Sequence, residues 1–425
     1  MSMKLNYLVA TALTACALIA TAGAAEMRKI AEIPVPGEPL ASFDISYLHQ
    51  ASQRFFLADR SNKAVDVFDA KANKFIGRVA GFVGAVVKDG RVDNAHSGPN
   101  GVLAFGEEAW AGDGDSTIKV IDLKGMKIVD TISTGGQGRA NENTYDPKDE
   151  IFIIGNQNET PPFTTMVSTK AGHKIIGKIM MPDATDGNEQ PMYNPADGLV
   201  YQPIPILRHD AKKGGIAVID PRTAMLLKTL EVDDCSPNGI AFGPNDNFAL
   251  GCTANGTKMD KAPPIIAIMN SKTGKLVANV PDIGGTDEIA YSKKNNQYYV
   301  PSRLPDGITL GVIDAATNKL VQKLPITGGN PHSVAVNDKG LCAAIAGTSS
   351  ASSVGWVERK RNPSLLRFAM IRAMMGFAAL NPSYSGGFRL ALSLPHRHKS
   401  QLVEQRHVAA AFGVRSRQQL RPIED

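Results

Sequence analysis

Two stretches with one pattern decide the fold: Val65-Asp66-Val67-Phe68-Asp69 followed by Lys74-Phe75-Ile76-Gly77-Arg78-Val79, and Leu310 to Asp314 followed by Lys319 to Leu324. Each reads as an alternating strand, a turn built on Asp or Asn with Gly or Lys, and a second alternating strand, which is the pattern of a β-hairpin. The pattern recurs at 118–132 and 216–230, and weaker copies begin at Thr164 and Ile265. The chain therefore contains an internal hairpin repeat.

The spacing of the repeat indicates its architecture. The last residue of each first strand marks a copy, and consecutive markers are 53, 46, 52, 50 and 44 residues apart: Asp69, Asp122, Ser168, Asp220, Asn270 and Asp314. This is the length of one four-stranded propeller blade. A second, more apolar hairpin precedes each copy, as at Gly239 to Gly251, and such strands are typical of an inner pair covered on both faces. We predict an all-β, seven-bladed β-propeller over residues 26–346.

The two ends of the repeat region predict a shared blade. Arg28 to Gly37 reads like Lys319 to Gly328, so the N-terminal segment supplies an outermost strand. The inner strands of that blade are expected at 332–336 and 341–346, and such closure removes exposed sheet edges. No fourth strand is recognised after residue 346, so we predict that the seventh blade is incomplete and is closed by the N-terminal strand.

The first 25 residues resemble a secretory signal. A short basic start precedes an Ala- and Leu-rich apolar stretch and the small residues Ala22-Gly23-Ala24-Ala25, so we expect cleavage after Ala24 or Ala25 and a periplasmic or secreted protein. Lipid attachment at Cys16 is the alternative. No other segment is apolar enough to span a membrane.

Export makes disulfides possible. After cleavage the chain would retain Cys235, Cys252 and Cys342, which permit at most one internal bridge. Cys235 precedes one predicted strand and Cys252 ends the next, so these two are expected at the same rim of one blade. Whether they are bridged stays open.

The C-terminal segment 347–425 does not follow the repeat. It holds 12 Lys and Arg against 4 Asp and Glu, so the net charge of +5 arises from this tail. The segment Ser364 to Leu380 predicts a basic, apolar helix of the kind that contacts membrane surfaces or partners. The alternatives are a frame-shifted, unevolved or disordered extension, because an unrelated sequence stands where an outer strand is expected.

The hairpin phrase Val312-Ile313-Asp314 with Thr317-Asn318-Lys319 resembles the YVTN-type propellers of exported bacterial proteins. The resemblance covers about residues 26–346 and implies the fold. It implies little about chemistry, because that family and its gluconolactonase, regucalcin and streptogramin-lyase relatives include both enzymes and binding proteins.

The starts of the innermost strands supply the candidate site. These strands point their starts toward one end of the central channel, and each contributes a polar residue there: Asp44, Asn100, Asn141 with Glu142, Glu189, Asn238, Asp287 with Glu288, and His332. Ends of the following strands are expected to line the same face, among them Asp59, Asp113 and Arg303. The longer segments 84–96, 156–163 and 203–213 are expected to cover this face in part.

Three interpretations of these residues remain open. In the first, the propeller binds a small polar molecule or a periplasmic protein partner, with Asp44, Asp59, Asn100, Asp113, Glu142 and Arg303 among the ligand-binding residues. In the second, which resembles the gluconolactonase arrangement, Glu189, Asn238 and Asp287 hold Ca²⁺ or another divalent ion and His332 or His96 acts as acid or base in a lactonase-like hydrolase or lyase. In the third, the propeller is a purely structural interaction module, and the polar groups only hydrogen-bond the strand ends and channel waters.

The residues do not decide between an enzyme and a binding protein. They do argue against nucleic acid as a partner, because mixed charge replaces the basic stripe that such binding requires. A monomer is expected.

Overall fold

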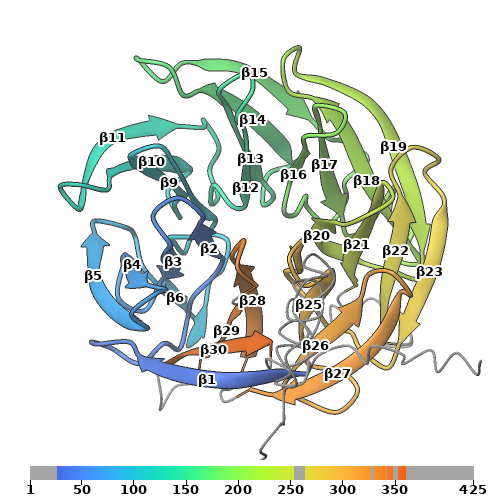
Figure 1. The fold of residues 1–425 in the computed structure, drawn as a ribbon. Helices are drawn as coiled ribbons and strands as arrows, with labels where there is room; N and C mark the ends of the chain where they lie inside the picture. Colours follow the sequence, from blue (N-terminus) through green and yellow to red (C-terminus); the bar gives the residue numbers. More distant parts are fainter. Residues whose placement is uncertain (1–25, 253–263, 327–329, 341, 348–352, 360–425) are drawn as a thin grey trace, which may run out of the picture. The chain divides into compact units, whose positions relative to one another are not determined.

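The computed structural model describes residues 26–252, 264–326, 330–340, 342–347 and 353–359. These residues form strands and turns and no α-helix, and hence no helix capable of crossing a membrane. Four-stranded antiparallel sheets are arranged in a ring around a central axis (Figure 1). The predicted all-β propeller of four-stranded blades is confirmed.

Six blades are built from consecutive strands. The first two contain β2 (Ser46–His49), β3 (Arg54–Asp59), β4 (Ala64–Asp69) and β5 (Lys74–Ala80), then β8 (Val102–Phe105), β9 (Glu108–Gly112), β10 (Thr117–Asp122) and β11 (Lys127–Ser133). The next two contain β12 (Asn143–Asp146), β13 (Ile151–Asn156), β14 (Phe163–Ser168) and β15 (Ile175–Met180), then β16 (Met192–Asn194), β17 (Leu199–Ile204), β18 (Lys213–Asp220) and β19 (Met225–Asp233). The last two contain β20 (Pro237–Phe242), β21 (Asn247–Cys252), β22 (Ile265–Asn270) and β23 (Leu276–Pro281), then β24 (Ala290–Ser292), β25 (Gln297–Ser302), β26 (Thr309–Asp314) and β27 (Lys319–Pro325). A small hairpin, β6 (Val87–Lys88) and β7 (Arg91–Val92), lies between the first two blades.

The remaining four-stranded sheet joins the two ends of the described chain. β1 (Met27–Pro34) pairs with β30 (Ser353–Arg359), which pairs with β29 (Cys342–Gly347) and then β28 (Asn330–Val336). The innermost strands contact one another in sequence, from β2 through β8, β12, β16, β20, β24 and β28 back to β2. The composite sheet therefore closes the ring (Figure 1).

The prediction that this blade lacks a strand, with the propeller ending at residue 346, is wrong. β30 lies at 353–359, within the stretch assigned to the basic tail. Val354 and Trp356 point into the core, where the Trp356 ring packs edge-on against Phe55 at 5.4 Å between centroids. The apolar alternation is short and runs directly into Arg359, Lys360 and Arg361, so its strand pattern is masked by the charge that follows.

The outer hairpins match the repeat closely. All six predicted markers end the third strand of their blades, and each hairpin carries a register shift just before that point. The turn follows from its residues: the Asp69 carboxylate accepts the backbone N–H of Lys71 and Ala72, and Asn73 takes the left-handed conformation at φ 51°. Asp, Asn and Gly favour such turns, which explains the recurring phrase.

A disulfide bond crosslinks the two innermost strands of one blade. Cys235 precedes β20 and is bonded to Cys252 at the end of β21, with 4.9 Å between their Cα atoms. The expectation that both lie at one rim of one blade is confirmed. The segments 1–25 and 360–425 lie outside the described residues, and with them the predicted signal, Cys16, the predicted helix and most of the tail.

Candidate binding site at the channel mouth

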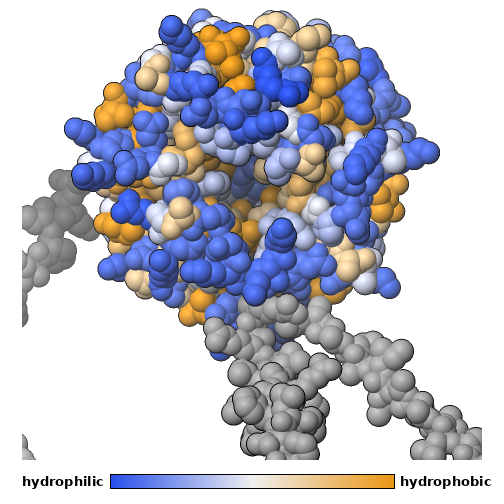
Figure 2. All heavy atoms as spheres, turned by 45° about the horizontal axis from the view of Figure 1, so that its top comes forward, coloured by the Kyte–Doolittle hydropathy of each residue, from blue (hydrophilic) through white to orange (hydrophobic). Residues whose placement is uncertain are grey.

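Polar side chains gather where the innermost strands begin. The face seen in Figure 2 is hollowed at its centre, and both hydrophilic and hydrophobic residues surround the hollow. We name as the polar mouth the residues Asp44, Asn100, Glu142, Glu189, Asn238, Asp287 and His332, which precede or begin the inner strands of all seven sheets. All of these except Asp287 and His332 are at least nine-tenths buried. The sequence alignment of strand starts therefore identified a real cluster.

Glycines allow the loops of the polar mouth to approach their neighbouring blades. The Gly101 amide donates to the Asn141 carbonyl at 2.9 Å, and the Gly239 amide donates to the Asp287 carbonyl at 2.7 Å. A Cβ atom on Gly239 would lie 2.3 Å from that carbonyl oxygen, and one on Gly101 would lie 2.7 Å from the oxygen of Asn141. Contacts this short are forbidden, so any side chain here would displace the loop that carries a mouth residue.

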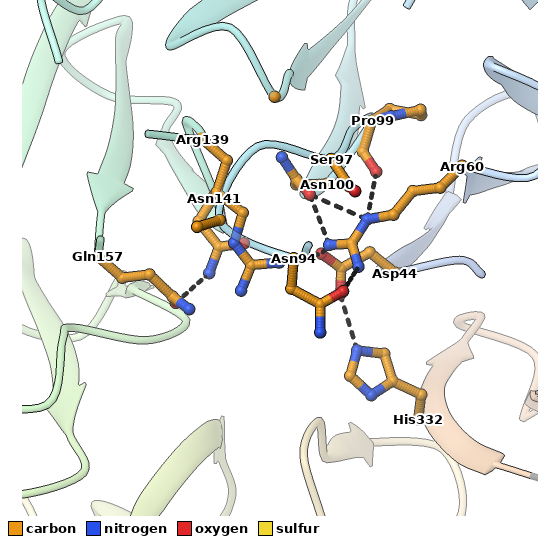
Figure 3. Close-up of polar contacts among 12 residues, drawn as sticks. Asp44, Arg60, Asn94, Ser97, Pro99, Asn100, Arg139, Asn141, Gln157 and His332 are labelled. Carbon is orange, nitrogen blue, oxygen red and sulfur yellow. Dashed lines mark hydrogen bonds and ion pairs between the residues drawn. The ribbon is translucent and has the colours of Figure 1, made fainter. Parts of the chain in front are cut away.

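Asp44 is the hub of the polar mouth (Figure 3). Its Oδ2 forms an ion pair with Arg60 and lies 3.5 Å from Nη1 of Arg139, while its Oδ1 lies 2.7 Å from Nε2 of His332. Arg60 is held in turn by Asn100, whose Oδ1 accepts from Nε at 3.1 Å. Burial would raise the pKa of Asp44, but Arg60, His332 and Arg139 outweigh burial and hold this pKa well below its usual range. Asp44 is therefore ionised.

His332 bridges two carboxylates. Its Nδ1 lies 2.9 Å from Oδ2 of Asp287, opposite the contact with Asp44. Asn238 donates to the other oxygen of Asp287 at 3.2 Å. Burial would lower the pKa of His332, but Asp287 and Asp44 dominate and raise this pKa to about 10. The ring is thus a doubly donating imidazolium at neutral pH.

Glu142 and Glu189 form the second half of the mouth. The Gln157 amide, oriented with its nitrogen toward Glu189 at 2.9 Å and its oxygen toward Arg139 Nη2 at 2.5 Å, links Glu189 to the arginine. Burial, together with the charge of Asp287, raises the pKa of Glu189 to about 8. Burial and the neighbouring Glu189 raise the pKa of Glu142 well above its usual range. Buried carboxylates that face one another cannot all ionise, so these two retain protons.

Three polar atoms of one short loop before β12 are buried without a hydrogen-bond partner among the described residues. They are Nε of Arg139, Oδ1 of Asn141 and Oε2 of Glu142. Arg139 is 9% exposed and Glu142 is 4% exposed. Leaving such groups unpaired costs on the order of 1–3 kcal/mol each, more for a charge. The loop therefore offers one donor and two oxygens to a guest molecule.

A neutral layer lies one step further along the strands. Gln190 donates to Oε1 of Glu288 at 2.9 Å, Ser333 donates to Oε2 of Glu288, and the Ser333 and Ser46 hydroxyls are 2.6 Å apart. Burial raises the pKa of Glu288 to about 8. This layer separates the polar mouth from the other end of the channel.

Aromatic side chains gather at that other end. We name as the aromatic mouth the half-buried rings that stand near the ends of six inner strands: Tyr47, Phe105, Tyr145, Tyr193, Phe242 and Tyr291. Phe105 and Tyr145 stack with centroids 4.0 Å apart and planes 9° from parallel. A cavity of about 1000 Å³ opens beside four of the rings. This end of the channel was not singled out by sequence reasoning.

Four predicted residues are occupied elsewhere. Asp59 accepts from the Asn62 side chain at 2.7 Å, and Asp113 accepts from the Gly114 amide at 2.8 Å, so both brace turns. Arg303 donates to the Gly285 carbonyl at 2.9 Å. Burial would raise the pKa of Asp287, but His332 and, to a smaller extent, Arg303 lower this pKa below its usual value. His96 lies in an exposed segment with its Nδ1 2.8 Å from Asp93.

The metal and catalytic assignments stay predictions. Glu189, Asn238 and Asp287 all lie at the polar mouth, but Glu189 faces Gln157, and Asn238 donates to Asp287. Within the described ranges, no three His, Cys, Asp or Glu side chains are grouped in a way that could hold a metal ion. The described contacts of His332 and His96 are made in separate clusters.

Sequence reasoning missed Arg139 and Gln157. Arg139 lies two positions before Asn141 in the stretch Gly135-Gly136-Gln137-Gly138-Arg139, and a lone arginine in a glycine-rich loop before an inner strand was the available signal. The predicted cover is seen in one segment: Asn94 accepts from Arg60 at 3.3 Å, and the Ala95 carbonyl accepts from the Arg139 amide at 2.7 Å. That segment thus fixes both arginines.

Comparisons with known proteins support the fold alone. The sequence matches no protein family and no curated protein. A chain of the Kuenenia stuttgartiensis hydrazine synthase is similar in structure, with a TM-score of 0.61 and 15% identity over 75% of this chain and 96% of that one. The resemblance to the YVTN-type family stays a prediction.

Proposed function

We propose that this chain is an exported β-propeller that binds a small polar molecule at the polar mouth. The observation that supports it is the unpartnered pair, Nε of Arg139 and Oε2 of Glu142. Both atoms lie in the short loop before β12, so they mark where a guest would complete the network. A small molecule is accommodated among buried polar groups more readily than the surface of a partner protein.

The chemistry of the pair defines the guest. Arg139 requires an acceptor, for which a carboxylate is the best match, and Glu142 is satisfied by an amine or hydroxyl donor. Glu142, Glu189 and Glu288 retain protons, so Arg60, Arg139 and the His332 imidazolium outnumber the ionised Asp44 and Asp287, and a carboxylate on the guest offsets this positive excess. We infer that the guest is a small amino acid or hydroxy acid.

Titration calorimetry on the full-length protein with glycine, L-serine, L-lactate and glycerol tests this function. We expect the amino acids or the hydroxy acid to bind, and Arg139→Gln and Glu142→Gln to weaken binding at least tenfold. Arg139→Gln removes a charged hydrogen bond of about 1.5–3 kcal/mol, and Glu142→Gln places an NH₂ donor where the guest's own donor needs an oxygen, which costs about 1–3 kcal/mol. Glu108→Gln, at the aromatic mouth, is the matched control and should bind normally. Unchanged affinity in both mouth variants, or no binding of any compound, would refute the proposal.

Export is the second part of the proposal. Its supports are the signal-like segment 1–25 and the disulfide between Cys235 and Cys252, because disulfides persist in oxidising compartments. Mass spectrometry of the protein from fractionated cells should find it outside the cytosol, beginning near Glu26. An intact Met1 in the cytosolic fraction would contradict export.

A further inference from the structure

The aromatic mouth encloses a second, separate space. Its cavity of about 1000 Å³ adjoins a smaller one of about 360 Å³, and both are lined by Tyr47, Gln190 and Tyr193. Together the two cavities are lined by residues of the inner strands of all seven sheets. Volumes of this size are typical of small-molecule sites.

The charges in this space have one sign. The residues that line the larger cavity include the carboxylates Glu107, Glu108 and Glu150, the smaller cavity is lined by the protonated Glu288, and neither lining contains Lys or Arg. Glu108 is fixed in place, because the Trp110 indole N–H donates to it at 2.8 Å. Glu150 is partly neutralised by Lys170 at 3.6 Å. Glu107 and Glu108 therefore carry most of the negative potential of the larger cavity.

Aromatic rings reinforce that potential. Tyr47, Phe105, Tyr145 and Tyr193 line the larger cavity, and Tyr291 and Phe242 line the smaller one. Each ring carries a negative face that attracts cations, by about 0.5–2 kcal/mol per contact depending on desolvation. Carboxylates beside rings, without a competing arginine or lysine in the lining, select a positive guest that also has apolar surface.

We propose that the aromatic mouth is a second binding site, for a small organic cation with a substituted ammonium group. The ammonium lies among the rings near Glu107 and Glu108, and its alkyl substituents contact Met192 and the rings. The polar mouth is a poor competitor for this guest, because Arg60, Arg139 and the His332 imidazolium surround its carboxylates.

Titration of the full-length protein with choline and with its uncharged isostere 3,3-dimethylbutan-1-ol tests the proposal. Choline should bind at least tenfold more tightly than the alcohol, because the two differ in charge and not in shape. The double variant Glu107→Gln with Glu108→Gln should weaken choline at least tenfold and leave the alcohol unchanged; Gln at 108 retains an acceptor for Trp110. Glu38→Gln, an exposed glutamate outside both cavities, is the matched control and should leave choline binding unchanged.

Several results would overturn this site. Equal affinity for choline and the alcohol would remove the role of charge, and normal choline binding by the double variant would remove the role of the two glutamates. Loss of choline binding in Glu142→Gln would place the cation at the polar mouth instead. Binding of a tetralysine peptide without binding of choline would indicate a protein partner. A failure of the amino acids to bind at the polar mouth leaves the choline result intact.

Discussion

The two ends of the channel are built from the same inner strands and have opposite chemistry. At the polar mouth, the buried Asp44 forms ion pairs with the buried Arg60 and with the half-buried His332. At the aromatic mouth the rings are half-buried, and the carboxylates have no arginine or lysine beside them in the cavity lining. The repeat gives all inner strands the same orientation around the channel. The position of a residue along its inner strand therefore determines whether its side chain lies at the polar mouth or at the aromatic mouth.

The largest expected effect comes from breaking the hub of the polar mouth. Asp44→Ala removes the shared partner of two arginines and His332, and it should lower the free energy of unfolding by about 3–5 kcal/mol, because buried positive charges are left uncompensated. Urea denaturation measures this loss. Glu231→Ala, which removes an exposed carboxylate that also contacts two cations, Arg208 and Lys213, is the control and should change little. Equal losses in both variants would mean that the hub has no special role.

The second-largest effect on the free energy of unfolding is expected from removing the disulfide beside the polar mouth. Cys235 and Cys252 close a loop at the polar end of β20 and β21, three residues before Asn238. Replacing both with Ser should cost about 2–3 kcal/mol, the expected effect for a loop of this size. Chemical denaturation of the variant, and of the wild type with reductant, measures the cost. A loss that appears with reductant but not in the variant would assign the effect to something other than this bond.

The charge states of the polar mouth predict how stability depends on pH. The folded pKa of His332 is raised to about 10, so its contribution is complete below about pH 6.5 and is lost as the pH rises toward 10. Glu189 and Glu288 have folded pKa values raised to about 8, so their contributions are also lost as the pH rises, between about 4.5 and 8. Stability should therefore fall from pH 5 to pH 10.

Urea midpoints measured between pH 5 and pH 10 test this dependence. His332→Gln should flatten the alkaline part, and Glu288→Gln should flatten the part below pH 8, each by at most about 1.4 kcal/mol per pH unit, the limit for one proton. A profile that rises with pH in this range would contradict the assigned charge states.

The smallest effect is expected at the aromatic mouth. Tyr145→Leu keeps an apolar side chain but removes the stack with Phe105, and it should cost about 0.5–1.5 kcal/mol. Denaturant titration beside Asp44→Ala compares the two mouths directly. A loss of unfolding free energy as large as that of Asp44→Ala would show that the aromatic side chains serve mainly to stabilise the packing between blades.

The sequence predicted the ring and the polar mouth for one reason: both follow from position within a repeat. The outer hairpins that turn after Asp69 and Asp314 have the same local turn chemistry, and strand starts can be aligned from one copy to the next. Val354 and Trp356 were missed because their alternation is short and basic residues follow it. The basic composition of this segment argued against a strand, but its pairing with β1 places a strand there.

The contacts within the mouths could not be predicted. Arg139 reaches Asp44 across 95 positions, and His332 reaches it across 288, so these partners depend on the curvature of the ring rather than on local pattern. The aromatic rings were hidden for a different reason. Tyr and Phe in a strand predict core packing as readily as a binding surface, and only the shape of the channel separates the two.

The blade shared by the two ends of the described chain determines which folding step comes last. Arg28 and Glu358, 330 positions apart, meet in an ion pair beside the pairing of β1 with β30. Six blades can collapse as the chain emerges during synthesis, but β1 must wait for the last strand to appear. Ring closure is therefore a late step dominated by one very long loop, which slows it relative to hairpin formation. A nascent chain halted before residue 353 would keep β1 without its partner, however well the other blades had formed.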